Sequence, residues 1–260
     1  MGTVKTKGII IQESISSDYD KMLTMLTPGL GKINVSAKGA RRPKSALLAG
    51  SQFLCFGEYI LYKGADIYSI NSCEVIEVFY NIRVDLDKLE CASNITRIIL
   101  QVTTENENTY RVLQLYLNTL HIISETDKNL NLVVSVFKLR LLKILGFCPN
   151  IRECVTCKKK EDLTTFSIKN NGFECNNCSK QDKSAIVISE PTKIAIQYIM
   201  LADPKKIYSF TVSEESIKEL AIVSKVYFEE KINWLVYGNI CGNKAKAQRE
   251  IVGLFINSNH

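Results

Sequence analysis

Two groups of residues in this sequence have the types and spacing that chemistry requires, and the first is a set of four cysteines. They form two C-x-x-C pairs separated by 17 residues, Cys154 with Cys157 and Cys175 with Cys178. Two such pairs at this spacing are typical of a structural zinc site, in which each pair gives two thiolates to one tetrahedral ion. Because protein fills all four ligand positions, none is left open for water. The expected cofactor is therefore a structural Zn²⁺.

Other uses of the four cysteines are a redox C-x-x-C or a pair of disulfides. The motif is duplicated and the chain has the features of a cytosolic protein, where disulfides rarely persist, so both are less favoured. A zinc hydrolase or deaminase would need His or Glu beside the cysteines, as in H-x-E followed by P-C-x-x-C, and the sequence has no such motif. The remaining cysteines lack paired spacing and are expected in the core: Cys55, Cys73, Cys91, Cys148 and Cys241.

The second group is a basic stretch, because no Asp or Glu occurs between Asp20 and Glu58. This window holds six basic residues, Lys21, Lys32, Lys38, Arg41, Arg42 and Lys44. The formal net charge of the whole chain is +6, so the rest of the chain is close to neutral. Charge concentrated in one short region predicts a surface for a polyanion. The alternative is a solvated loop that only keeps the protein soluble.

The local pattern indicates how this charge is displayed. Alternating apolar and polar residues over 32–38 predict a half-buried strand with a cationic face, and Pro43 prevents the ladder from continuing. A basic strand followed by a basic loop suits contact with phosphates, with no base being read. The candidate DNA contacts are Lys32, Lys38, Arg41, Arg42 and Lys44. No segment has the G-x-x-x-x-G-K-[ST] spacing of a phosphate-binding loop, so we predict no ATP hydrolysis.

The residues before about position 80 have the pattern of strands. Turn residues separate five β-rich runs, which are Val4–Gln12, Lys21–Leu26, Lys32–Lys38, Phe53–Tyr62 and Ile67–Val78. Five short strands predict a closed oligonucleotide-binding (OB) barrel, since closure removes the exposed edges. The aromatic residues in this region are candidates for stacking on bases or for filling the barrel: Phe53, Phe56, Tyr59, Tyr62 and Tyr68.

From Asp85 the apolar period changes to three or four residues and predicts helices. We expect helices over 86–102, 112–123 and 132–145, another from Ser189 to about Ala202, and a long one opened by a capping box at Thr211–Glu214. The predicted fold class is thus α+β, an OB barrel followed by an all-helical domain with an inserted zinc knuckle. The expected domains are 1–80, 81–147 with 184–260, and the insert 148–183. A smaller basic cluster, Lys244, Lys246 and Arg249, is a possible secondary DNA-binding site.

Composition excludes several classes of protein. The chain has 260 residues, of which 46% are hydrophobic and 23% charged, as in ordinary globular proteins. We find no signal peptide and no run of about 18 apolar residues, so we expect a cytoplasmic, nucleoid-associated protein without membrane contact. There are only two histidines, which leaves little for histidine acid–base catalysis. We therefore expect a binding protein and not an enzyme.

Several motifs together resemble the bacterial RecO family of recombination mediators. They are Asp18–Thr27, Gly31-Lys32, Ala37–Ser45 and Gly146–Asn150 just before Cys154, and the order of segments matches nearly end to end. The resemblance implies a non-enzymatic protein that binds single- and double-stranded DNA and anneals complementary strands. It also implies that RecR is a partner and that RecA is loaded onto DNA coated by single-stranded-DNA-binding protein. By motif, Lys38, Arg41, Arg42 and Lys44 become the DNA contacts and the four paired cysteines the zinc ligands. An RNA- or transcription-associated module with a zinc ribbon is the alternative.

Overall fold

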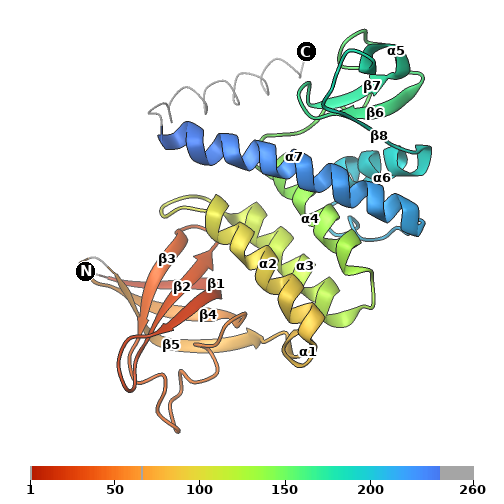
Figure 1. Ribbon diagram of the computed structural model, residues 1–260. Helices are drawn as coiled ribbons and strands as arrows, with labels where there is room; N and C mark the ends of the chain where they lie inside the picture. Colours follow the sequence, from red (N-terminus) through yellow and green to blue (C-terminus); the bar gives the residue numbers. More distant parts are fainter. Residues whose placement is uncertain (1, 66, 241–260) are drawn as a thin grey trace. The chain divides into compact units, whose positions relative to one another are not determined.

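The chain folds into two compact units, residues 1–130 and residues 131–260 (Figure 1). The structure is a computed structural model that describes residues 2–65 and 67–240, with side chains up to residue 233. The expected secondary basic cluster at Lys244, Lys246 and Arg249 lies outside the described residues. The boundary between the units, after residue 130, differs from the predicted domain boundaries near residues 80 and 147. The predicted domain boundaries stay a prediction. Among the described residues, every helix is too short or too polar to span a lipid bilayer.

The first unit opens with a closed five-stranded barrel. Its strands are β1 (Thr3–Ile15), β2 (Lys21–Thr27), β3 (Gly31–Ala37), β4 (Phe56–Lys63) and β5 (Tyr68–Glu77). Their order around the barrel is β1-β2-β3-β5-β4, and all neighbours are antiparallel except the short parallel contact of β3 with β5. A five-stranded barrel closed by one short parallel pairing is the OB architecture. The predicted α+β class with an N-terminal OB barrel is confirmed.

Side-chain alternation explains why the barrel forms. On β3, Ile33, Val35 and Ala37 are buried while Asn34 between them is exposed, as the period of two predicted. Tyr59 on β4 is fully buried, and its hydroxyl donates to the carbonyl of Gly50 at 2.8 Å. This bond satisfies the one polar atom that the ring brings into the core.

Three helices complete the first unit: α1 (Tyr80–Val84), α2 (Leu86–Val102) and α3 (Tyr110–Glu125). Figure 1 shows α2 and α3 side by side next to the barrel. Asp85 caps α2 by accepting the backbone N–H of Lys88 at 3.0 Å. The short helix α1 was not predicted, because five residues are too few for a periodic pattern.

The loop between α2 and α3 is bonded to the turn between β2 and β3. The Lys32 N–H donates to the Thr104 carbonyl at 3.0 Å, and the Asn106 N–H donates to the Leu30 carbonyl at 2.9 Å. Gly31, at the start of β3, has a φ of +71° and pairs with Glu105. A Cβ at Gly31 would lie 2.2 Å from the Thr104 carbonyl oxygen, so a glycine is required where the two segments meet.

The second unit combines helices with a small sheet. Its elements are α4 (Leu130–Ile144), β6 (Leu163–Ser167), β7 (Gly172–Cys175), α5 (Asn176–Ser179), β8 (Ala185–Val187), α6 (Glu190–Leu201) and α7 (Glu214–Ile240). The three strands pair in the order β7-β6-β8. The buried guanidinium of Arg140 on α4 donates to the Ile199 and Ala202 carbonyls at 2.8 and 2.9 Å, which satisfies the end of α6.

One predicted helix cap needs correction, and another holds its position with a different side-chain bond. Ser213, not Thr211, caps α7, since its hydroxyl accepts the Ser216 N–H at 3.3 Å. Ser189 lies at the cap position of α6 as predicted, but its hydroxyl donates to Glu219 at 2.7 Å and does not accept a backbone N–H of the helix. The cap of α7 thus lies two residues after the predicted one, and the Ser189 hydroxyl is bound by a side chain 30 residues away.

Replacement of Gly31 by Ala should destabilise the first unit. Strained backbone at φ +71° together with the close approach of the Thr104 carbonyl should lower the free energy of unfolding by about 2 kcal/mol or more. Gly29→Ala is the matched control, because a Cβ there meets nothing within 4 Å, and its effect should stay within about 0.5 kcal/mol. Urea unfolding followed by circular dichroism gives both values. Equal stability of the two variants would contradict this account of the turn.

Candidate nucleic-acid interface and metal centre

Residues Lys38–Lys44, which we call the basic loop, leave β3 in a series of hydrogen-bonded turns. The Arg42 N–H donates to the Gly39 carbonyl at 3.1 Å, and the Ser45 N–H donates to the Arg42 carbonyl at 3.0 Å. The loop is therefore folded locally without a ladder, as Pro43 requires. The structure brings four of the predicted contact residues together here, all of them exposed: Lys38, Arg41, Arg42 and Lys44. Within the part of the chain that is described, none of these four side chains forms an ion pair.

A second loop, Ser16–Asp20 between β1 and β2, is bonded directly to the basic loop. The Arg41 N–H donates to the Tyr19 carbonyl at 3.0 Å, and the Arg41 Nη1 donates to the Ser17 and Asp18 carbonyls at 3.2 and 3.1 Å. The Asp20 Oδ1 accepts the Gly39 N–H at 2.7 Å. These bonds fix the position of one loop against the other.

The charge of this region is smaller than the sequence window implied. The Gly39 N–H, then the Ser17 hydroxyl, and also the charges of Lys38 and Arg42 lower the pKa of Asp20, so its carboxylate stays ionised. Four cations beside the two carboxylates Asp18 and Asp20 leave a net charge of +2 in the two loops. The surface remains positive, and its cations lie on the exposed side chains.

Two other basic residues of the window are engaged elsewhere. Lys21 forms an ion pair with Glu13 at 2.7 Å. Lys32, a predicted DNA contact, is half-buried, and its Nζ donates to the Leu100 carbonyl in the last turn of α2 at 2.7 Å. A lysine at the carboxyl end of a helix is stabilised by the helix dipole. Lys32 therefore has a structural partner in the last turn of α2.

The aromatic residue at this surface is not one of the five that the sequence singled out. Tyr59 fills the barrel, and Phe53, Phe56 and Tyr68 are partly buried. Tyr19, in contrast, is 53% exposed in the loop between β1 and β2. The guanidinium carbon of Arg42 lies 5.2 Å from the centre of its ring, a cation–π contact. An aromatic residue in an otherwise polar turn is the signal in the sequence that would have found it.

A hollow of about 510 Å³ lies at this point of the surface. Its lining residues are Tyr19, Arg42, Pro43 and Lys44. The hollow thus has two flat side chains, from the tyrosine and the proline, and two cations. This combination can take an aromatic group and a phosphate together.

In the second unit, the four paired cysteines converge as predicted. Their Sγ atoms all lie within 4.8 Å of one another, and the Sγ atoms of Cys157 and Cys175 are 3.7 Å apart. A tetrahedral zinc site with Zn–S bonds of 2.3 Å places its sulfurs about 3.8 Å apart. The geometry therefore fits one metal ion held by four thiolates: Cys154, Cys157, Cys175 and Cys178.

Hydrogen bonds prepare two of these sulfurs as ligands. Burial alone would raise the pKa of Cys154, but backbone N–H groups, first that of Cys157, lower it to about 6. The Cys178 N–H is the main cause that lowers the pKa of Cys175. The neighbouring sulfurs, first that of Cys175, raise the pKa of Cys178 to about 12. Four thiolates so close together need a cation between them to ionise fully.

The loops that carry the cysteines are held by a buried glutamate and by aromatic packing. The Glu174 Oε1 accepts from the Thr156 hydroxyl at 2.8 Å and from the Asn170 amide at 2.9 Å. The ring of Phe166 on β6 meets that of Tyr227 on α7 edge to face, with centroids 5.2 Å apart. The four-cysteine insert is therefore packed on α7 within the second unit.

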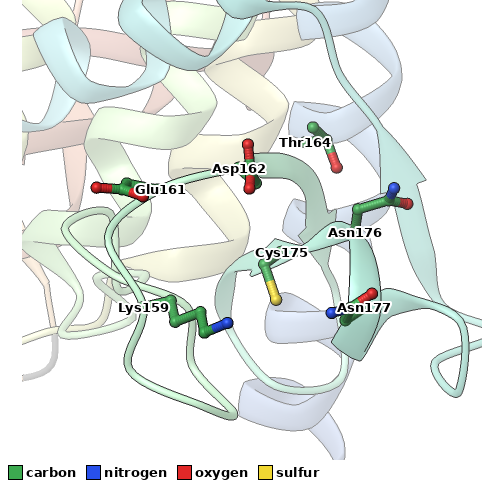
Figure 2. A pocket seen from close by; sticks show the side chains of 7 residues that line it. All are labelled: Lys159, Glu161, Asp162, Thr164, Cys175, Asn176 and Asn177. Atoms are coloured by element: carbon green, nitrogen blue, oxygen red, sulfur yellow. The ribbon is translucent and has the colours of Figure 1, made fainter.

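A polar hollow of about 300 Å³ lies beside the cysteine cluster, and Figure 2 shows Cys175 in the middle of its lining side chains. The other lining residues are Lys159, Glu161, Asp162, Thr164, Asn176 and Asn177. Two carboxylates against one amine make it unsuited to a phosphate. It belongs to the surroundings of the metal centre.

The chain thus has the architecture of a nucleic-acid-binding protein. It combines a five-stranded OB barrel that carries an exposed basic loop with a helical unit that carries four clustered cysteines. Comparison with known families identifies the family to which it belongs. The family model described as "Recombination protein O N terminal" matches residues 1–79, and "Recombination protein O C terminal" matches residues 83–234. The chain belongs to the RecO family, as its motifs had indicated.

Curated relatives agree with the family models. The chain is 42% identical to the DNA repair protein RecO of Acetivibrio thermocellus over 233 residues, which cover 89% of this chain and 93% of that one. It is 33% identical to the DNA repair protein RecO of Alkaliphilus metalliredigens over 225 residues, or 86% and 92% of the two chains. For the protein of the same name from Bacillus subtilis the identity is 28% over 227 residues, or 87% and 88%.

The converging thiolates should hold about one zinc ion per chain. Cys175→Ser should lose the metal, because three thiolates and a hydroxyl bind it more weakly, whereas Cys148→Ser, outside the cluster, should keep it. Metal analysis of the purified variants measures this. Removal of the metal from the wild type by a chelator should lower the melting temperature by several degrees, since metal binding is coupled to folding. Equal metal content in both variants would rule out the site.

Proposed function

We propose that this chain is a DNA-binding recombination mediator that anneals complementary single strands. With RecR it would help to load RecA onto DNA coated by single-stranded-DNA-binding protein. The observation that carries the proposal is the basic loop, whose four exposed cations lack ion pairs among the described residues, on the OB barrel of a RecO family member.

The mechanism follows from charge. Two complementary strands repel each other through their phosphates, and a cationic surface that holds both lowers this barrier. Each phosphate that Lys38, Arg41, Arg42 or Lys44 neutralises releases counterions, which favours binding of single and double strands alike. Base pairing between the strands then drives annealing, so no catalytic group is required.

We propose a structural role for the metal, with zinc as the ion. Four protein ligands leave no open position for substrate or water, so the ion would hold the loops of the insert on the small sheet. The domains at residues 1–80, 81–147 with 184–260, and 148–183 would then divide the work into DNA binding, docking of partner proteins and stabilisation. The protein would act in the cytoplasm, on the nucleoid.

Reversal of charge in the basic loop should weaken DNA binding. Arg42→Glu with Lys44→Glu should lower the affinity for single and double strands at least tenfold at low salt and reduce the salt slope by about 1.5, because two phosphate contacts are lost. Arg41 is left intact, since it bonds to the carbonyls of Ser17 and Asp18. Fluorescence titration at several salt concentrations measures both quantities.

The control for this variant is Arg111→Glu, an exposed arginine on α3 outside the basic loop. It changes the net charge in the same direction and should leave the salt slope unaltered. If the loop variant binds with the affinity and slope of the wild type, the basic loop is not the DNA contact. A preference for RNA in a direct competition would favour the RNA-binding alternative.

Annealing should depend on the same charges and not on nucleotide. Neutralisation of Lys38, Arg42 and Lys44 to Gln, with Arg41 again left intact, should slow the pairing of complementary oligonucleotides at least tenfold, because phosphate repulsion is no longer offset. The addition of ATP should change neither rate. A fluorescence-quenching assay of strand pairing follows both proteins, and an ATP-dependent rate would refute the proposed mechanism.

A further inference from the structure

The hollow between the basic loop and the loop Ser16–Asp20 is lined by an aromatic ring, that of Tyr19, as well as by cations. The backbone of Tyr19 is fixed there, because its carbonyl accepts a hydrogen bond from the Arg41 N–H at 3.0 Å. The residues on either side are also fixed, through the Asp18 carbonyl on Arg41 Nη1 and the Asp20 carboxylate on the Gly39 N–H. The backbone that carries the ring is therefore fixed before any ligand arrives, which lowers the entropy cost of binding.

The ring itself remains largely open to solvent. Tyr19 is 53% exposed, although burial in the core is the usual fate of a large aromatic side chain. The guanidinium of Arg42, 5.2 Å from the ring centre, keeps a cation beside the ring, and Pro43 and Lys44 complete the hollow. A flat apolar surface is thus placed within the reach of side chains that bind phosphate.

We infer that Tyr19 stacks on an unpaired base of single-stranded DNA while Arg42 and Lys44 bind the adjacent phosphates. Aromatic rings stack on every base, so the contact needs no particular sequence. A base in a duplex is already stacked on its neighbours and paired, and it cannot enter the hollow without unpairing. Tyr19 would therefore make the basic loop prefer single strands, whereas its cations alone bind both forms. This inference rests on the proposed DNA binding by the basic loop.

The test separates bases from phosphates. Three DNAs of equal length are titrated at one salt concentration: a normal single strand, a strand of abasic residues with the same phosphates, and a duplex. The proteins are the wild type, Tyr19→Ala, Tyr19→Phe, Arg42→Glu and Tyr110→Ala, the last a tyrosine on α3 that is also 53% exposed. Circular dichroism verifies that each variant is folded, as expected for changes at exposed side chains.

Tyr19→Ala should lower the affinity for the normal strand roughly 5- to 100-fold, the effect of losing one stacked base. Its affinities for the abasic strand and the duplex should match those of the wild type. Tyr19→Phe keeps the ring and should bind like the wild type, as should Tyr110→Ala. The wild type should quench the fluorescence of the base 2-aminopurine placed in the normal strand, and Tyr19→Ala should not.

Two results would overturn the inference. If Tyr19→Ala weakens binding of all three DNAs by one factor, Tyr19 only positions Arg42. If it weakens none, the ring makes no contact. If the basic loop does not bind DNA at all, the result is different, because Arg42→Glu would then leave the affinity for the abasic strand unchanged. If Arg42→Glu binds the abasic strand weakly while Tyr19→Ala binds every DNA like the wild type, the basic loop remains the DNA contact and the stacking by Tyr19 is refuted.

Discussion

The basic loop is held in place by backbone groups, and this leaves its side chains available. Arg41 is positioned by the carbonyls of Ser17 and Asp18, and Gly39 by the Asp20 carboxylate through a backbone N–H. An arginine bound to carbonyls keeps its full charge, whereas a carboxylate partner would cancel it. Four cations can then lie close together at the surface, where the carboxylates of Asp18 and Asp20 offset part of their mutual repulsion and leave a net charge of +2 in the two loops. DNA binding as we propose it depends on this arrangement.

The two compact units reach stability in different ways. The first has a barrel core and a tight contact between Gly31 and the Thr104 carbonyl, which joins the barrel to the loop between α2 and α3. The insert of the second unit contains only two short strands, β6 and β7, of five and four residues. A segment this small needs further support, which the packing of Phe166 on Tyr227 provides and which one ion bound by the four clustered thiolates would add.

Local patterns in the sequence were enough to predict most of the elements. The alternation of Ile33, Val35 and Ala37 predicted the strand and its inner face, and the spacing of the cysteines predicted their cluster, because both depend on local spacing in the chain. Prediction was weaker where a distant residue decides. The strand expected from Phe53 begins at Phe56. Phe53 itself lies in a turn, and its carbonyl accepts a hydrogen bond from the Arg83 guanidinium at 2.7 Å.

By itself the sequence determined the barrel strands, the longer helices, the family and the clustering of the four cysteines, since each is encoded in residue spacing. Only the tertiary structure decided which charges remain free. It paired Lys21 with Glu13, turned Lys32 to the Leu100 carbonyl and brought Tyr19 beside Arg42. The physical reason is that Coulomb and hydrogen-bond energies depend on distances between atoms. Residues 68 positions apart, such as Lys32 and Leu100, acquire such a distance only when the chain folds.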